Sequence, residues 1–329
     1  MVKKLDHKGY YFIAPFFVIF LVFNIYPVLL TFYYTFTHYE GYGAPEFIGL
    51  ANYARILTDT YFLEAFVNTW KIWGLNFALQ LGIALFLAAL FSDLRFRIKG
   101  LGFFRAIFYL PNLITISSVA ILFNIMLDWH YGSINQFLLK IGLIGEPINW
   151  LNQPFTAQVS VSLILTWMWF GYTFIVLMAG VSGISKEYYE AALIDGANRM
   201  QTFMYITLPL LKPIMLYVMI TSLIGGLQLF DLPMLLTDGL GNPDGALNTM
   251  VLYLYNQAFR YNNYGYAATI AYMLFLITVV FSAITFKSMY REASGEKAVA
   301  KAEKRKSKAA KKRGNVNVQE KVAKQNTYI

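Results

Sequence analysis

Cysteine is absent from this chain of 329 residues, and histidine and charged side chains are scarce. The lack of cysteine excludes disulfides, thiol catalysis, cysteine-ligated zinc and iron–sulfur clusters. The three histidines, His7, His38 and His130, lie too far apart in the sequence to show a metal-ligand spacing. Charged residues make up 14% of the chain, against roughly 25% in an average soluble domain. This shortage of polar sequence argues against a soluble enzyme.

The chain also lacks the groups that would let it drive chemistry or transport alone. There is no Gly-Lys pair anywhere, so the phosphate-binding loop of ATPases is excluded. The middles of the long apolar stretches carry no ionisable side chain, whereas proton-coupled transporters place such groups inside the bilayer. Sodium binding by backbone carbonyls stays open. The sequence shows no Ser/His/Asp or paired-carboxylate constellation, so we predict no catalytic residue, no metal site and no cofactor of its own.

Apolar residues make up 57% of the chain and are concentrated in long stretches. Each stretch reaches the roughly 20 residues that an α-helix needs to cross a bilayer. The first is too long for a cleavable signal peptide and has no A-x-A-like site after it, which indicates an uncleaved anchor. Six helices buried in a soluble core would need more polar sequence to cover them. We therefore predict an all-α polytopic membrane protein with six transmembrane helices near residues 11–36, 69–91, 103–127, 157–180, 211–236 and 266–286.

The distribution of basic residues predicts the orientation. Lysine and arginine cluster in the N-terminal segment 1–10 and in the second and fourth connections, and are sparse on the opposite side. Because cytoplasmic loops carry such an excess, both termini should be cytoplasmic. The membrane domain then covers residues 11–291 and a basic cytoplasmic tail covers 292–329. Residues 287–329 hold 13 Lys and Arg against 4 Asp and Glu, which accounts for the net charge of +9. Such a tail suits the anionic membrane surface, and we predict no nucleic-acid partner.

The cytoplasmic connection at residues 185–209 is the most informative segment. Its pattern predicts a short amphipathic helix with Ser185 as N-cap and Glu187 in the first turn. Gly196 suits the left-handed position after the helix, and a second short helix should run toward Pro209. The small side chains of Ala191 and Ala192 let another protein approach the helix closely. Larger side chains add apolar contacts: Tyr188, Tyr189 and Leu193.

The same connection carries a fixed spacing: Glu-Ala-Ala, three residues, Gly, nine residues, Ile, one residue and Leu-Pro. The matching positions are Glu190, Ala191, Ala192, Gly196, Ile206, Leu208 and Pro209. This motif resembles the hallmark loop of the membrane permease subunits of binding-protein-dependent ABC importers. Two further segments, residues 47–53 and 229–231, resemble the carbohydrate-uptake branch of that family. The turn at residues 238–243 departs from the family pattern, and the basic tail is not part of it.

The resemblance implies a type I importer fold in a bacterial inner or plasma membrane. It implies two cytoplasmic ATPase subunits that bind ATP and magnesium, a second permease that completes a heterodimer, and an extracytoplasmic solute-binding protein. Half of the translocation pathway would then belong to this chain, and the cargo would be a sugar, with oligosaccharides foremost. By the same resemblance, contact with the ATPase falls to Tyr188, Glu190, Ala191, Ala192, Asp195 and Gly196.

A substrate pathway is expected near the middle of the fourth and fifth helices. Sugars present hydroxyls above apolar faces, so aromatic and neutral polar side chains suit them. Trp169 and Tyr172 are three residues apart and share a helix face. Such aromatics also face lipid, and Gly and Ser also pack helices, so each residue has this structural alternative. Candidates on the fifth helix are Ser222, Gly226 and Gln228, with Asp231 as an outer gate or a simple interfacial acid.

Two other classes of function stay open on the sequence alone. A self-sufficient secondary transporter or channel would work without any ATPase. A membrane scaffold would use residues 186–196 only to hold a cytoplasmic enzyme.

Overall fold

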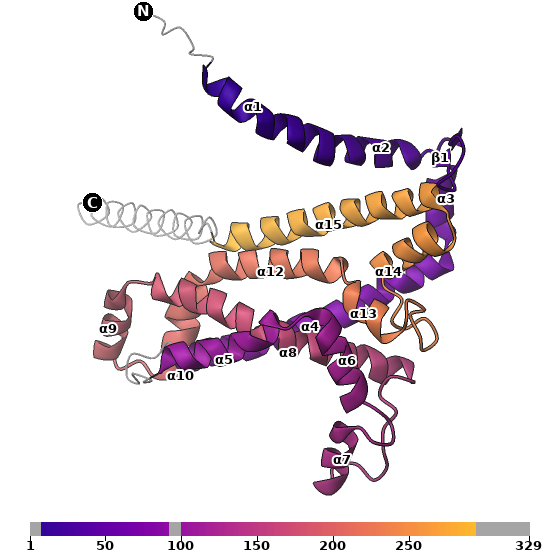
Figure 1. The fold of residues 1–329 in the computed structure, drawn as a ribbon. Helices are drawn as coiled ribbons and strands as arrows, with labels where there is room; N and C mark the ends of the chain where they lie inside the picture. The colour runs from indigo at the N-terminus through magenta and orange to yellow at the C-terminus, as the bar shows by residue number, and fades with distance from the viewer. Residues whose placement is uncertain (1–7, 92–99, 294–329) are drawn as a thin grey trace, which may run out of the picture.

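The computed structural model describes residues 8–91 and 100–293. The predicted N-terminal segment before residue 8, the basic residues at 95, 97 and 99 and nearly all of the tail lie outside the described residues. In Figure 1 the long helices run lengthwise side by side, and the described start of the first helix and end of the last lie at the same end of the molecule. This arrangement agrees with the prediction that both termini are on one side of the membrane.

Five of the six predicted membrane spans are confirmed as long apolar helices among the described residues. The first span is one continuous helix with a π-helical turn in its middle. The fifth span consists of a long helix, a short break and a second, short helix. Their bounds are α1 (Lys8–Phe20), η1 (Leu21–Ile25) and α2 (Tyr26–Tyr34); α4 (Thr60–Phe91); α8 (Pro154–Ser182); α12 (Lys212–Leu227) with α13 (Asp231–Leu236); and α15 (Tyr264–Ala293).

The described helices differ from the prediction in two respects. The third span is not one helix over 103–127: α5 (Leu101–Leu113) and α6 (Ile116–Met126) meet at an angle of 89°. The chain is extended at Ile114 and Thr115, just after Pro111, and an apolar pattern does not reveal such a short break. The second span starts at Thr60 rather than near 69, because the Asp59 carboxylate accepts hydrogen bonds from the first free N–H groups of α4.

A ladder of polar side chains joins α4 to α8 across the membrane. Asn68 accepts a hydrogen bond from Gln158 at 2.9 Å near the outer end. Deeper in the bundle, Thr166 donates to Asn76 at 3.2 Å, and Gln80 donates to Thr173. Buried polar groups in a membrane need partners, so these bonds favour one register of the two helices.

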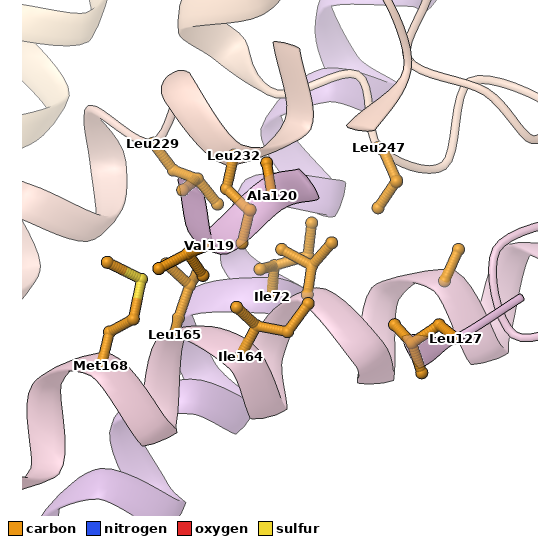
Figure 2. Packing of buried hydrophobic residues seen from close by; sticks show 12 residues of the cluster. Ile72, Val119, Ala120, Leu127, Ile164, Leu165, Met168, Leu229, Leu232 and Leu247 are labelled. Atoms are coloured by element: carbon orange, nitrogen blue, oxygen red, sulfur yellow. The ribbon is translucent and has the colours of Figure 1, made fainter. Parts of the chain in front are cut away.

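Apolar packing completes the core beside this ladder. Figure 2 shows Ile72 of α4 facing Ile164 and Leu165 of α8, with Val119 of α6 and Leu232 of α13 above them. These four elements are therefore held as one body. Helix α6 follows the break in the third span, and α13 follows the break in the fifth. Because both helices pack in this core, the two breaks lie next to each other.

The ends of the bundle carry the short elements. At the end away from the termini, β1 (Thr37–His38) pairs with β2 (Glu46–Phe47), with Thr37 opposite Phe47. The other short helices there are α3 (Ala51–Thr58), α7 (Ser133–Lys140), α14 (Met250–Tyr255) and η3 (Asn256–Arg260). The opposite end carries α9 (Lys186–Ile194), α10 (Arg199–Thr202), η2 (Phe203–Thr207) and α11 (Leu208–Leu210).

Asp59 ties the outer elements together. Its carboxylate accepts hydrogen bonds from the hydroxyls of Tyr253, at 2.6 Å, and Tyr266. The guanidinium of Arg55 lies 3.9 Å from the centre of the Tyr266 ring. Burial alone would raise the pKa of Asp59, but these hydroxyls and the N–H groups at the start of α4 outweigh burial and lower it. The loop before α4 is thus fastened to α14 and α15.

Candidate functional site

Helix α9 has the end structures that its sequence predicts. The Ser185 side chain accepts a hydrogen bond from the backbone N–H of Glu187 at 3.4 Å. At the other end, Gly196 has a φ of +74°, in the left-handed region. The N–H groups of Gly196 and Ala197 donate to the carbonyls of Leu193 and Ala192, at 3.2 and 2.9 Å. This pair of hydrogen bonds is the Schellman motif, which favours glycine at position 196.

A second capped turn follows α9. Asn198 and Gln201 form a capping box in which each side chain bonds to the other's backbone N–H, both at 2.8 Å. The chain then passes through η2 and α11 into α12. A short, hydrogen-bonded segment therefore links α9 to a membrane-spanning helix.

The faces of α9 differ from the expectation at two positions. Tyr189 and Ala192 are buried within this chain, so neither forms part of an open docking surface. They are three residues apart and share the inward face. The Tyr189 hydroxyl lies 3.2 Å from the Thr207 hydroxyl and fastens α9 to η2. The outward surface carries the other predicted residues, which are exposed: Tyr188, Glu190, Ala191, Asp195 and Gly196.

A cavity of about 280 Å³ lies between α4, α8 and α12. It is close to the lower limit of small-molecule sites, roughly 300 Å³. Within it, the rings of Trp169 and Tyr172 meet edge to face at 6.0 Å. All the residues proposed for the pathway and the gate line this one cavity: Trp169, Tyr172, Ser222, Gly226, Gln228 and Asp231. The structure thus brings together side chains that the sequence places on separate helices.

The cavity has polar groups at both ends. The Tyr172 hydroxyl lies 3.4 Å from that of Tyr217. Gln228 and Asp231 stand where α12 ends and α13 begins, both exposed. Asp231 is the one acidic side chain among the described lining residues. The wall is otherwise aromatic, aliphatic or neutral polar, which suits an uncharged ligand rich in hydroxyls.

The sequence interpretation missed the contribution of α4. Trp73, Asn76 and Gln80 line the cavity opposite α12, and Thr173 joins them from α8. A signal was present: Asn76 and Gln80 are four residues apart in an otherwise apolar helix, and therefore share one face. In the described part of the chain, no three His, Asp or Glu side chains gather in a way that could hold a metal ion.

The contacts of Gly226 match the structural alternative, in which a glycine lets two helices pack closely. A Cβ atom at this position would lie 1.8 Å from the Trp73 ring. The glycine therefore makes room for an indole of the same chain rather than for an approaching ligand. Ser222 is also engaged, because its hydroxyl accepts a hydrogen bond from the Trp73 indole N–H at 3.2 Å.

The helical bundle, the exposed loop helix and the cavity define a multi-pass membrane permease. Comparison with known proteins supports this class: the chain belongs to the family of binding-protein-dependent transport system inner membrane components, which matches residues 80–287. It is 38% identical to the lactose transport system permease protein LacF of Rhizobium radiobacter, over 85% of this chain and 93% of the relative. It is 34% identical to the arabinooligosaccharides permease AraP of Bacillus subtilis, over 84% and 87%.

The fold is shared with a solved importer. The crystal structure of a bacterial alginate ABC transporter, in complex with an alginate pentasaccharide-bound periplasmic protein, contains a chain with a TM-score of 0.75. Identity is 23%, and the match covers 88% of this chain and 96% of that one. The type I ABC importer permease fold is therefore confirmed.

Proposed function

We propose that this chain forms one half of the translocation pathway of an ATP-driven sugar importer that accepts oligosaccharides. The observation that carries the proposal is the cavity, where Trp169 and Tyr172 stand beside neutral polar groups between three membrane-spanning helices. Aromatic surfaces and neutral hydrogen-bonding groups together match a sugar ring. Relatives named for lactose and arabinooligosaccharides support the same class of cargo.

The exposed face of α9 is the proposed contact with an ATPase subunit. Glu190 offers a charge to a groove of an ATPase subunit, and Gly196 makes the turn that presents the helix. ATP and magnesium would bind in the two ATPase subunits. Closure of that pair would move α9, and the capped segment after it would pass the motion to α8 and α12. The cavity between those helices would then open alternately to the two sides.

A second permease would complete the pathway. The first span, Tyr10–Tyr34, has no charged residue, and its most apolar stretch has no buried residue. In Figure 1 its first part, α1, stands apart from the rest of the bundle, whereas α2 contacts α15 through Phe32 and Tyr272. We propose that this helix packs on the second permease in a bacterial cell membrane. An extracytoplasmic solute-binding protein would deliver the sugar to the outer end, where Asp231 stands as part of the gate.

Reconstitution tests the proposal by omission. Proteoliposomes would hold this chain with its partner permease, ATPases and binding protein, and uptake of labelled lactose and maltose would be measured. We expect uptake only with all components and ATP. Uptake without the ATPases would instead establish a secondary transporter or channel. Replacing Trp169 and Ser222 together by alanine should abolish uptake while the complex still assembles, and an unchanged rate would remove both from the pathway.

A further inference from the structure

Trp73 is held in one position by three neighbours. Phe77 stacks on its ring with the centroids 5.4 Å apart and the planes 14° from parallel. Trp70 meets it edge to face at 5.2 Å. From α12, the Ser222 hydroxyl accepts the indole N–H bond at 3.2 Å. A side chain fixed in this way acts as a rigid wall rather than as a flexible filler.

The notch that receives Trp73 depends on one of two adjacent glycines. A Cβ on Gly226 would lie 1.8, 2.4 and 2.7 Å from three atoms of the indole. A Cβ on Gly225 would have nothing within 4 Å, although this glycine lines the same cavity. Only Gly226 is therefore required by the position of Trp73.

Ser222 keeps one unused hydrogen-bonding group. A serine hydroxyl accepts and also donates. Its oxygen accepts the indole N–H, and its own hydrogen finds no acceptor among the described residues. The oxygen lines the cavity next to the apolar indole. One sugar ring matches both features: its C–H face can pack on the apolar indole, and a hydroxyl oxygen of the same ring can accept the hydrogen bond from Ser222.

We infer that Trp73, held by Ser222 and by the notch at Gly226, is a specificity-determining residue of the translocation cavity. Its indole packs against the C–H face of one sugar ring while the Ser222 hydroxyl donates to a hydroxyl of that ring. Gly226 is a positioning residue, because it acts through the indole. The inference rests on the proposed sugar cargo and adds to it a subsite on α4.

Matched variants of the complete complex in proteoliposomes test the inference. Gly226→Ala displaces the indole and Trp73→Leu removes it, whereas Gly82→Ala adds the same methyl group on α4 with nothing within 4 Å and outside the cavity lining. The readout is the ratio of the initial uptake rates of lactose and maltose. A ratio does not change when less complex assembles, so it separates specificity from stability. We expect Gly226→Ala and Trp73→Leu to change the ratio about fivefold, the effect of losing one aromatic contact, and Gly82→Ala to leave it unchanged.

The double variant Trp73→Leu with Gly226→Ala provides a second measurement. If the methyl group acts only by displacing the indole, it has no effect once the indole is gone. The double variant should then match Trp73→Leu in both ratio and thermal stability. Additive effects would overturn the positioning role of Gly226.

Fluorine NMR with 5-fluorotryptophan reports on Trp73 without transport. Trp73→Phe assigns its resonance, and Trp129, at the outer end, serves as the internal control. Gly226→Ala should shift the Trp73 signal, Gly82→Ala should not, and added lactose should shift Trp73 but not Trp129. A complex that takes up no sugar would overturn the proposed function. Normal uptake with unchanged ratios and an unmoved Trp73 signal would overturn this inference alone.

Discussion

Replacement of Gly196 by alanine should uncouple the permease from its ATPase. The left-handed conformation at Gly196 is unfavourable for an L-residue by roughly 1–2 kcal/mol. A Cβ there would meet nothing within 4 Å in this chain, so backbone strain is the whole effect within the permease itself. A change of about 1 kcal/mol lowers the equilibrium constant for forming the turn about fivefold, and the fraction of complexes with a formed turn falls by up to that factor. Gly196→Asn should have a smaller effect, because asparagine tolerates this conformation.

The chain offers a matched control at the outer end. Gly142 ends α7 with a φ of +72° and nothing within 4 Å of a Cβ. Gly142 and Leu143 donate to the carbonyls of Leu139 and Leu138, which is the same Schellman motif. Gly142→Ala therefore brings equal strain far from α9.

The assay is ATP hydrolysis stimulated by the sugar-loaded binding protein, measured per assembled complex. We expect stimulation to fall by up to about fivefold in Gly196→Ala. Gly142→Ala should lower thermal stability by a similar amount and leave stimulation intact. Equal loss in both variants, or none in Gly196→Ala, would refute the assignment of α9 as the coupling element.

Three further predictions concern the contacts that hold the site. Tyr189→Phe removes the hydroxyl next to Thr207 and should loosen α9 by about 1 kcal/mol, seen as faster amide hydrogen exchange in residues 186–194. Asn135→Ala removes an amide that donates to the Ile148 carbonyl at 2.9 Å and accepts from the Trp150 indole at 2.9 Å. The free energy of local opening, measured by amide hydrogen exchange, should fall by about 2 kcal/mol around α7 and stay unchanged in α9. Asp59→Asn should destabilise the complex at neutral pH by about 2 kcal/mol, because a carboxylate acceptor is lost. The folded-state pKa of Asp59 lies below the ordinary 3.8, so its contribution is complete above that pH and is lost as pH falls through the lower value. The melting temperature of the wild type should then drop more steeply below pH 4 than that of Asp59→Asn, and parallel curves would contradict the network.

Local signals made the ends of α9 predictable. A capping serine and a glycine after the helix act through bonds to residues two to five positions away, so the sequence shows both partners. The membrane spans were predictable because a bilayer demands long apolar helices. The bend between α5 and α6 was not, since two extended residues do not disturb an apolar pattern.

Contacts between distant segments were the hardest to predict. Trp169 and Tyr172 could be paired from their spacing on one helix. The partner of Gly226 is Trp73, on another helix, and only the packing of α4 against α12 brings them together. The inward direction of Ala192 likewise depends on how α9 rests on η2, which its own sequence does not specify.

The most direct test of the central claim compares two kinds of proteoliposome under an imposed lactose gradient. One holds this permease alone, and the other holds the complete complex with ATP inside and the binding protein outside. The account predicts uphill lactose uptake by the complex, none by the permease alone, and cross-linking of a photoreactive residue at position 190 to an ATPase subunit. Lactose flux through the permease alone, or an unlinked position 190 in a transporting complex, would contradict it.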